Sequence, residues 1–277
     1  MPLSSKIVPR WLICLVALLA LGAEQPSRDW KETHSFAAPE ATQAAAADDR
    51  FVYAISNRVI AKYDRATEKL IARSTGEASH LNSGFFFAGK LYSAHSNFPE
   101  KPERSELKVL DPEKMSLETY KNFGASDGSL TWAIRDPAEA KKAESATDRP
   151  DFQPPSTDFD KGIWWLNFAY YGDENSKTYL ARYENGRETR RWTYPPEAIK
   201  KFGKNSASCG IWRDDRLLVT GHDEREFHLF ELPKEGSVLT LVATVAAPFT
   251  GQGFAADPAG GGLIGIDRAK RRVVIAR

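Results

Sequence analysis

Imidazole, amide, carboxylate and guanidinium side chains recur in this sequence where a hydrophobic run begins or ends. Three of the five histidines, His80, His95 and His222, occupy such places. A histidine without a metal titrates near neutral pH, so each of the three is a candidate general base for catalysis. The same imidazoles, together with Asn and Asp oxygens, could instead hold a divalent cation with water in its open positions. The spacing does not choose between the two, because the sequence has no His-x-x-x-His pair, cysteine pair or EF-hand loop.

Amide and arginine side chains at similar places are the candidates for substrate binding. They are Asn57, Arg58, Asn97, Asn167 and Arg268. A guanidinium group matches the geometry of a carboxylate, so Arg58 and Arg268 would suit an acidic substrate. Asn, Asp and Ser also cap turns, however, and surface arginines commonly pair with a neighbouring acid. A hydrogen-bonded structural network is therefore the alternative interpretation of the same residues.

The elements that must position these residues belong to a degenerate repeat, in which a hydrophobic strand ends in a turn with charge and Gly or Pro. Tyr63, Leu110, Tyr183 and Phe230 stand at matching places in four copies. Their separations are about 47, 73 and 47 residues, close to the length of a propeller blade once an insertion of roughly 26 residues is removed. Short runs rich in Val, Ile, Tyr, Phe and Trp between turn residues predict four strands in each unit.

Five such units fit the chain, and their first strands are expected at 43–48, 82–88, 129–135, 208–213 and 253–257. The sequence ends before the fifth unit reaches a fourth strand. Thr33–Ala38 is a spare strand near the other end, and it would complete that unit and leave no open sheet edge. The predicted fold is therefore all-β, a five-bladed β-propeller closed by an N-terminal strand, with six blades as the second choice.

The first and second strands of a unit are antiparallel neighbours, so the start of the first and the end of the second share one face of the ring. The candidate residues fall at these points, which predicts a polar site at one mouth of the central channel. The charged, Pro-containing insertion 136–160 falls between the first and second strands of the third unit. We expect this insertion to be a flexible loop on the opposite face.

The remaining aromatic, cysteine and histidine residues are expected to have structural or surface positions. Most of the tryptophans would pack between blades, where large rings bury the most area. Cys209, the cysteine outside the N-terminal apolar run, would be a buried and inert thiol. His228 falls in the middle of a third strand, where we expect it to lie at the surface.

Residues 1–23 have the features of a secretory signal peptide. Lys6 and Arg10 precede an apolar run, Trp11–Leu21, that is short for a membrane span, and small residues follow it. Residues 24–277 would then form a single exported domain in the periplasm or outside the cell, a monomer with no stable membrane span after cleavage. The formal net charge of +1, with no basic stripe, argues against nucleic-acid binding.

Five stretches carry a likeness to known proteins, namely 52–64, 80–84, 94–97, 128–132 and 262–268. They resemble secreted β-propellers of the senescence-marker/gluconolactonase and NHL-like group, and bacterial propellers of the cycloisomerase or lactonising type. This resemblance implies one divalent cation of the Ca²⁺ or Mg²⁺ class at the channel mouth, held by side-chain oxygens. The ligands would be Asn82, Asn97, Asn167 and Asp267, and no glutamate stands in an equivalent place.

Two functions of different classes follow. The first is a lactonase- or cycloisomerase-like enzyme that acts on a small ring ester or carboxylate. His95 or His222 would be its base, and amides or a cation would stabilise the oxyanion. The alternative is a non-catalytic propeller that binds a glycan, peptide or partner protein at the channel mouth. Fold alone does not decide between them, because propellers host many activities.

Overall fold

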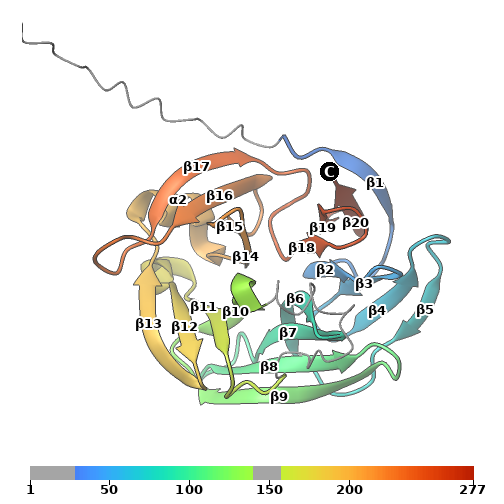
Figure 1. Ribbon diagram of the computed structural model, residues 1–277, viewed down its shortest axis with the longest axis horizontal. Helices are drawn as coiled ribbons and strands as arrows, with labels where there is room; N and C mark the ends of the chain where they lie inside the picture. The colour runs from blue at the N-terminus through green and yellow to red at the C-terminus, as the bar shows by residue number, and fades with distance from the viewer. Residues whose placement is uncertain (1–28, 140–156) are drawn as a thin grey trace, which may run out of the picture.

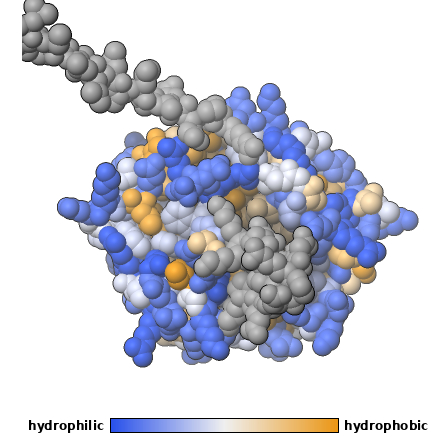
Figure 2. Space-filling model, in the orientation of Figure 1, coloured by the Kyte–Doolittle hydropathy of each residue, from blue (hydrophilic) through white to orange (hydrophobic). Residues whose placement is uncertain are grey.

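The predicted strands assemble into five four-stranded antiparallel sheets arranged as a ring around a central axis (Figure 1). This computed structural model describes residues 29–139 and 157–277. The predicted signal peptide lies outside the described residues, as does 140–156 of the predicted insertion. Figure 2 shows polar residues around most of the outline of the ring, with isolated hydrophobic residues between them.

Each blade follows chain order, and its first strand lies nearest the axis (Figure 1). The first blade is β2 (Ala44–Ala47), β3 (Phe51–Ile55), β4 (Ile60–Asp64) and β5 (Leu70–Arg73). The second is β6 (His80–Phe87), β7 (Lys90–Ser96), β8 (Arg104–Asp111) and β9 (Ser116–Ala125). The third is β10 (Ser129–Arg135), β11 (Ile163–Ala169), β12 (Tyr179–Glu184) and β13 (Arg187–Thr193). The fourth is β14 (Cys209–Arg213), β15 (Arg216–Thr220), β16 (Glu226–Glu231) and β17 (Thr240–Ala246).

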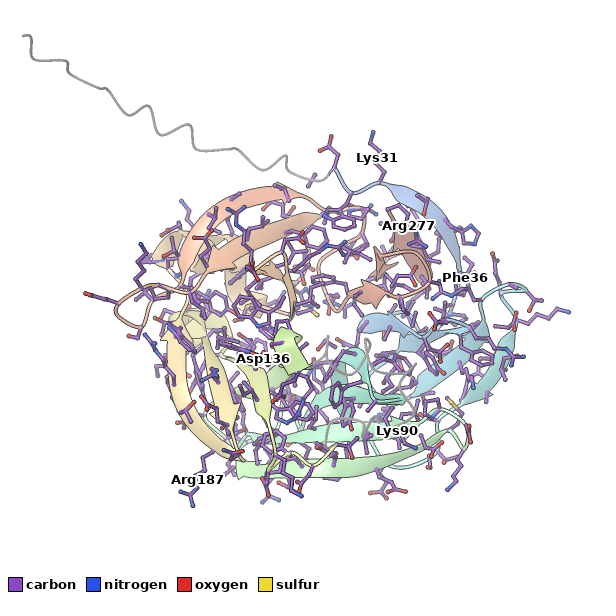
Figure 3. The ribbon with its side chains drawn as sticks, viewed as in Figure 1. Lys31, Phe36, Lys90, Asp136, Arg187 and Arg277 are labelled. Atoms are coloured by element: carbon purple, nitrogen blue, oxygen red, sulfur yellow. The ribbon has the colours of Figure 1, made fainter. Side chains whose placement is uncertain are left out.

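The fifth blade is built from both ends of the described chain. It contains β18 (Ala255–Asp257), β19 (Gly262–Asp267), β20 (Arg272–Ala276) and, in the outermost position, β1 (Glu32–Ala37). β1 pairs antiparallel with β20, with Ser35 opposite Val274. The backbones of Lys31 and Arg277 exchange hydrogen bonds of 3.1 and 3.0 Å, and Figure 3 labels both residues at this junction. The prediction of five blades closed by an N-terminal strand is confirmed.

Small residues allow the five innermost strands to approach one another. All four residues of β2, Ala44–Ala47, are alanines and all are buried. A Cβ atom on Gly253 would lie 2.3 Å from the Cβ of Ala44, so only glycine fits there. The Gly253 N–H donates to the Gln43 carbonyl oxygen at 2.7 Å, which joins the fifth blade to the first at the axis. The channel mouth is therefore built on closely packed and rigid backbone.

Large aromatic side chains fill the space between blades, as predicted. Trp132 and Trp164 are completely buried, and Trp165 is 4% exposed. Cys209 is also buried, and its Sγ lies 3.2 Å from the Phe254 carbonyl oxygen. Burial raises the pKa of the Cys209 thiol to about 12, so the prediction of a buried, unreactive thiol agrees with the structure.

A short helix that the strand pattern did not predict covers the fourth blade. α2 (Pro196–Phe202) begins with proline, has Glu197 in its first turn and ends at Gly203, whose φ is 65°. Proline, acid and glycine at these places are the usual signals for the two ends of a helix. Phe202 packs against His228 with ring centroids 5.1 Å apart. His228 is therefore only 1% exposed, and its predicted surface position was wrong.

Candidate functional site

The predicted polar face contains a pocket at the ring axis, to which all five blades contribute. Its volume is about 220 Å³. We call it the channel pocket, and its lining residues are Gln43, Asn57, His80, Asn82, Ser83, Phe98, Thr131, Tyr171, Asn205, Ser208, His222, Gln252 and Arg268. A wider outer recess of about 920 Å³ shares Gln43, Asn57, His222 and Arg268 with it and is also lined by Arg58, Asp223 and Arg271.

Uncharged hydrogen-bonding groups and one guanidinium define the character of the channel pocket. Among the described residues that line it, Arg268 is the only arginine or lysine, and none is an aspartate or glutamate. The remaining polar groups are amides, hydroxyls and two imidazoles. In the outer recess, three arginines face a single acid, Asp223. The charged side chains that line this mouth are therefore mainly basic, and such a surface attracts anions.

The Arg268 side chain contacts a histidine, and within 29–139 and 157–277 it forms no ion pair with a carboxylate. Its Nη1 lies 2.8 Å from His222 Nε2. On the other side of the same ring, His222 Nδ1 lies 2.6 Å from Asp223 Oδ1. Asn205 Nδ2 adds contacts of 3.2 Å to His222 Nδ1 and 3.3 Å to Asp223 Oδ2. A chain of contacts thus runs from the exposed Asp223 into the channel pocket.

His80 lines another part of the pocket wall. Its ring packs against Phe98 with centroids 5.4 Å apart, and Phe98 packs against Tyr171 at 4.7 Å. Burial, and then the nearby charge of Arg268, lower the pKa of His80. No hydrogen bond to the His80 ring occurs within the described part of the chain. His80 is therefore a neutral imidazole with free nitrogen atoms, which is the state that a general base requires.

Two residues at this face hold backbone conformations that glycine alone adopts easily. Gln252 has a φ of 115° and is 3% exposed. Ser206 has φ 64° and ψ −167°, and it is completely buried beside the pocket-lining Asn205. Such strain persists only where the surrounding structure enforces it, and it is commonly found at functional sites. It is an independent reason to place the site here.

Among the sequence-predicted site residues, the structure brings Asn57, His80, Asn82, His222 and Arg268 together in the channel pocket, and Arg58 lies in the outer recess. Asn57 accepts a hydrogen bond of 2.5 Å from Gln43 Nε2. Asn82 donates to the Leu130 carbonyl oxygen at 3.0 Å. These contacts fix both amides at the pocket wall.

His95, a predicted catalytic residue, supports the pocket from behind and does not line it. Its Nε2 accepts the backbone N–H of Ser79 at 3.0 Å and lies 3.1 Å from the Ser79 hydroxyl. Its Nδ1 lies 3.2 Å from Glu106 Oε2. The Ser–His–Glu order is that of a nucleophilic triad, but the Ser79 N–H already occupies the nitrogen that would have to take the proton. Burial, and then the charge of Lys108, lower the pKa of His95 to about 4, so it holds the start of β6 as a neutral acceptor.

The other predicted residues do not line the pocket themselves. Asn97 bridges its own loop through the Arg104 N–H at 2.7 Å and the Pro102 carbonyl at 3.0 Å. Asn167 is fully buried, donates to Thr131 at 2.9 Å and accepts from the Tyr194 hydroxyl at 2.8 Å.

Asp267, the fourth member of the predicted cation set, is paired with Arg225 at 2.9 Å and with Lys270 at 3.3 Å. The structure therefore does not bring Asn82, Asn97, Asn167 and Asp267 together. No group of three His, Cys, Asp or Glu side chains suited to a metal occurs in 29–139 and 157–277. The divalent cation stays a prediction of the family resemblance.

Eight pocket-lining residues are not among the predicted site residues, namely Gln43, Ser83, Phe98, Thr131, Tyr171, Asn205, Ser208 and Gln252. Ser83 and Thr131 lie in β6 and β10, and the other six lie in the connections that enter a first strand or leave a second strand. Because these connections belong to the same face as the predicted residues, their position in the repeat was the signal that could have found them.

Comparisons with known proteins give information on the fold. No protein-family model and no curated protein sequence matches the chain. Glutaminyl cyclase from Myxococcus xanthus is similar in structure, with a TM-score of 0.55, 7% identity and coverage of 90% of this chain and 95% of that chain. A structure of the mitotic checkpoint complex has a TM-score of 0.44, 10% identity and coverage of 83% and 62%. Hydrazine synthase from Kuenenia stuttgartiensis has a TM-score of 0.43, 9% identity and coverage of 82% and 68%.

At 7% identity, the similarity to the glutaminyl cyclase shows the fold alone. The protein is a five-bladed β-propeller with a polar pocket at one mouth of its channel. Within the described residues, no helix is long and apolar enough to cross a membrane.

Proposed function

We propose that the channel pocket binds a small hydroxylated carboxylate, and that the protein opens or closes the corresponding ring ester. The proposal rests on the surroundings of Arg268. This residue lines a pocket that has no acidic lining residue, and its side chain forms a hydrogen bond to the imidazole of His222, not to a carboxylate. A half-buried guanidinium is stabilised by an anion with two parallel oxygens. An anionic ligand is therefore the group that best complements Arg268.

The other lining groups suit the rest of such a ligand. Amide side chains of Asn57, Asn82 and Gln252 can donate to or accept from hydroxyl groups. The ring of Phe98 is 37% exposed and is backed by Tyr171, so it offers a flat surface to a ring-shaped ligand. These two features favour a sugar acid or its lactone over a simple aliphatic acid.

His80 is suited to the chemical step. In ring opening, the His80 imidazole takes a proton from water, and the water oxygen forms a bond to the ester carbonyl carbon. The carbonyl oxygen becomes negatively charged, and Arg268 and the amides stabilise it. The bond from carbon to the ring oxygen then breaks, and the ring oxygen receives the proton from the His80 imidazolium. The acyl carbon leaves this step as a carboxylic acid, which loses its remaining proton to solvent, and the resulting carboxylate stays on Arg268. Ring closure follows the same steps in reverse, beginning with uptake of that proton.

The comparisons support this proposal only through the fold. The Myxococcus xanthus neighbour is named as a cyclase, which illustrates that a propeller of similar shape can be an enzyme. The resemblance to gluconolactonase-type propellers supports lactone chemistry, and the features of residues 1–23 support export.

Binding and turnover can be tested with one panel of probes. We expect isothermal titration calorimetry to detect D-gluconate, and proton release to report hydrolysis of D-glucono-1,5-lactone. Arg268→Gln should weaken gluconate binding by about 10- to 100-fold, since a hydrogen bond to a charged group contributes about 1.5–3 kcal/mol. Arg187→Gln, at an exposed position of β13 that lines neither cavity, is the control and should bind as the wild type does.

Equal binding by Arg268→Gln and the wild type would overturn the proposal, as would no binding of any carboxylate or lactone at millimolar concentration. Binding without hydrolysis would select the alternative of a non-catalytic glycan-binding propeller. The exposed Phe98 ring and the amide-rich wall are the observations that favour this second function.

A further inference from the structure

We infer that His222 is a positioning residue, whose neutral imidazole aims the Arg268 guanidinium into the channel pocket while Asp223 fixes the imidazole. This inference rests on the proposed function, because it explains how the pocket keeps an arginine ready for a carboxylate. It assigns His222 a role other than the base that its sequence position suggests.

Hydrogen-bond chemistry determines the protonation of the His222 ring. A guanidinium can only donate, so His222 Nε2, at 2.8 Å from Arg268 Nη1, must be the acceptor. The ring proton then lies on Nδ1 and is donated to Asp223 Oδ1 at 2.6 Å. The Asn205 amide nitrogen, 3.2 Å from Nδ1, then donates to Asp223 Oδ2 at 3.3 Å and not to the ring. The imidazole is therefore neutral, in the tautomer that carries its proton on Nδ1. Its Nε2 lone pair is occupied and is not available to act as a base.

A neutral histidine beside Arg268 leaves the guanidinium charge available to an anionic ligand, which an acidic side chain would not. A carboxylate at the same place would hold Arg268 but would also satisfy its charge, and an incoming anion would then have to compete. Asp223 lies one side chain further away, and its side chain is 70% exposed, so water and salt screen its charge from the pocket. The guanidinium is thus oriented without being neutralised.

The backbone of His222 is itself fixed. Gln252 Nε2 lies 3.4 Å from the His222 carbonyl oxygen. A Cβ atom on Gly251 would lie 2.6 Å from the His222 carbonyl carbon, so the two segments are in direct contact. The strained Gln252 and the His222 ring therefore belong to one packed unit, which holds Arg268 from the fourth and fifth blades.

Nitrogen NMR tests the tautomer directly. In the ligand-free full-length protein at neutral pH, long-range proton–nitrogen spectra of His222 should show a protonated Nδ1 and an unprotonated Nε2. His222→Ala identifies the resonances. A ring protonated at Nε2, or at both nitrogens, would overturn the inference, because Nε2 could not then accept from Arg268.

Two substitutions test the consequence for binding, with D-gluconate as the probe. His222→Leu removes the acceptor and should weaken binding by about fivefold, since Arg268 must then be ordered by the ligand. His222→Gln supplies an amide oxygen in its place and should restore most of the affinity. Equal loss in both variants, with wild-type urea stability, would overturn the positioning role.

The two proposals fail in different ways. If the wild type binds no carboxylate but His222 shows the Nδ1 proton, the proposed function is wrong and the contact with Arg268 stands as a structural one. If gluconate binds and depends on Arg268, but His222→Leu binds it as the wild type does, only the positioning role is wrong.

Discussion

The substitution Gln252→Gly should stabilise the protein while it weakens the channel pocket. Gln252 has a φ of 115°, which is open to glycine but strained for other residues. Holding a side chain there costs about 1–3 kcal/mol, whereas glycine adds about 0.5–1 kcal/mol of chain entropy loss on folding. The substitution also removes the 3.4 Å hydrogen bond to the His222 carbonyl oxygen, which contributes about 0.5 kcal/mol. The expected balance is a gain of about 1 kcal/mol in the free energy of unfolding.

Urea unfolding followed by tryptophan fluorescence measures this gain as a higher midpoint with an unchanged slope. Gln43→Gly is the matched control, because Gln43 lines the same pocket and is 8% exposed but has no positive φ. It should lose about 1–2 kcal/mol through chain entropy and its hydrogen bond to Asn57. Gluconate binding should weaken in both variants, since each loses a pocket amide. A lower urea midpoint for Gln252→Gly than for the wild type would refute the strain reasoning.

Three further predictions concern closure, acid stability and the thiol. The Phe36 side chain in β1 is 4% exposed, and its ring lies 5.6 Å from the Tyr63 ring. Phe36→Ala should therefore lower the free energy of unfolding, measured in urea, by about 3–5 kcal/mol. A decrease below about 1 kcal/mol would show that β1 does not hold the ring closed. Burial lowers the pKa of His228 from 6.5 to about 4. Between pH 6.5 and pH 4, His228 is therefore protonated in the unfolded chain but not in the folded protein, so the free energy of unfolding falls as the pH decreases. His228→Gln should reduce that fall, by up to about 1.4 kcal/mol per pH unit, and an unchanged pH profile would contradict this. Iodoacetamide should label Cys209 only after unfolding, because the thiol is 2% exposed and has its pKa raised to about 12. Rapid labelling of Cys209 in the native protein, distinguished from Cys14 by peptide mapping, would contradict the burial.

The architecture could be predicted from the sequence because strand periodicity and turn residues are local signals. Every blade needs an antiparallel pair joined by a tight turn, and such turns carry residues that tolerate positive φ. Asn185 and Gly186 between β12 and β13, and Asp214 and Asp215 between β14 and β15, have this conformation. The repeat then required a partner for the last strand, and the N-terminal strand was the spare segment.

The orientation of individual side chains could not be predicted in the same way. His80 and His95 fall on neighbouring strands, but His95 is paired with Leu81 and Glu106, while His80 is paired with Ser96. Alternation along the strand therefore turns the two rings to opposite sides. A register shift between Leu81 and Gly84 then lets the adjacent residues Asn82 and Ser83 both line the pocket. A bulge of this kind depends on tertiary packing, and the strand pattern carries no sign of it.

Ring closure and the candidate site are physically connected through the turn that carries Arg268. This turn follows β19, and Asp267 at its start accepts the Lys270 N–H at 3.1 Å and pairs with Arg225 of the fourth blade at 2.9 Å. β19 pairs with β20, which pairs in turn with β1. Loss of β1 would expose the edge of β20 and loosen the strand pair that presents Arg268, so the N-terminal strand supports the pocket as well as the fold. Asp267 thus supports the site by stabilising the turn that carries Arg268. A carboxylate at the end of a strand is consistent with this structural role as well as with the predicted role of a metal ligand.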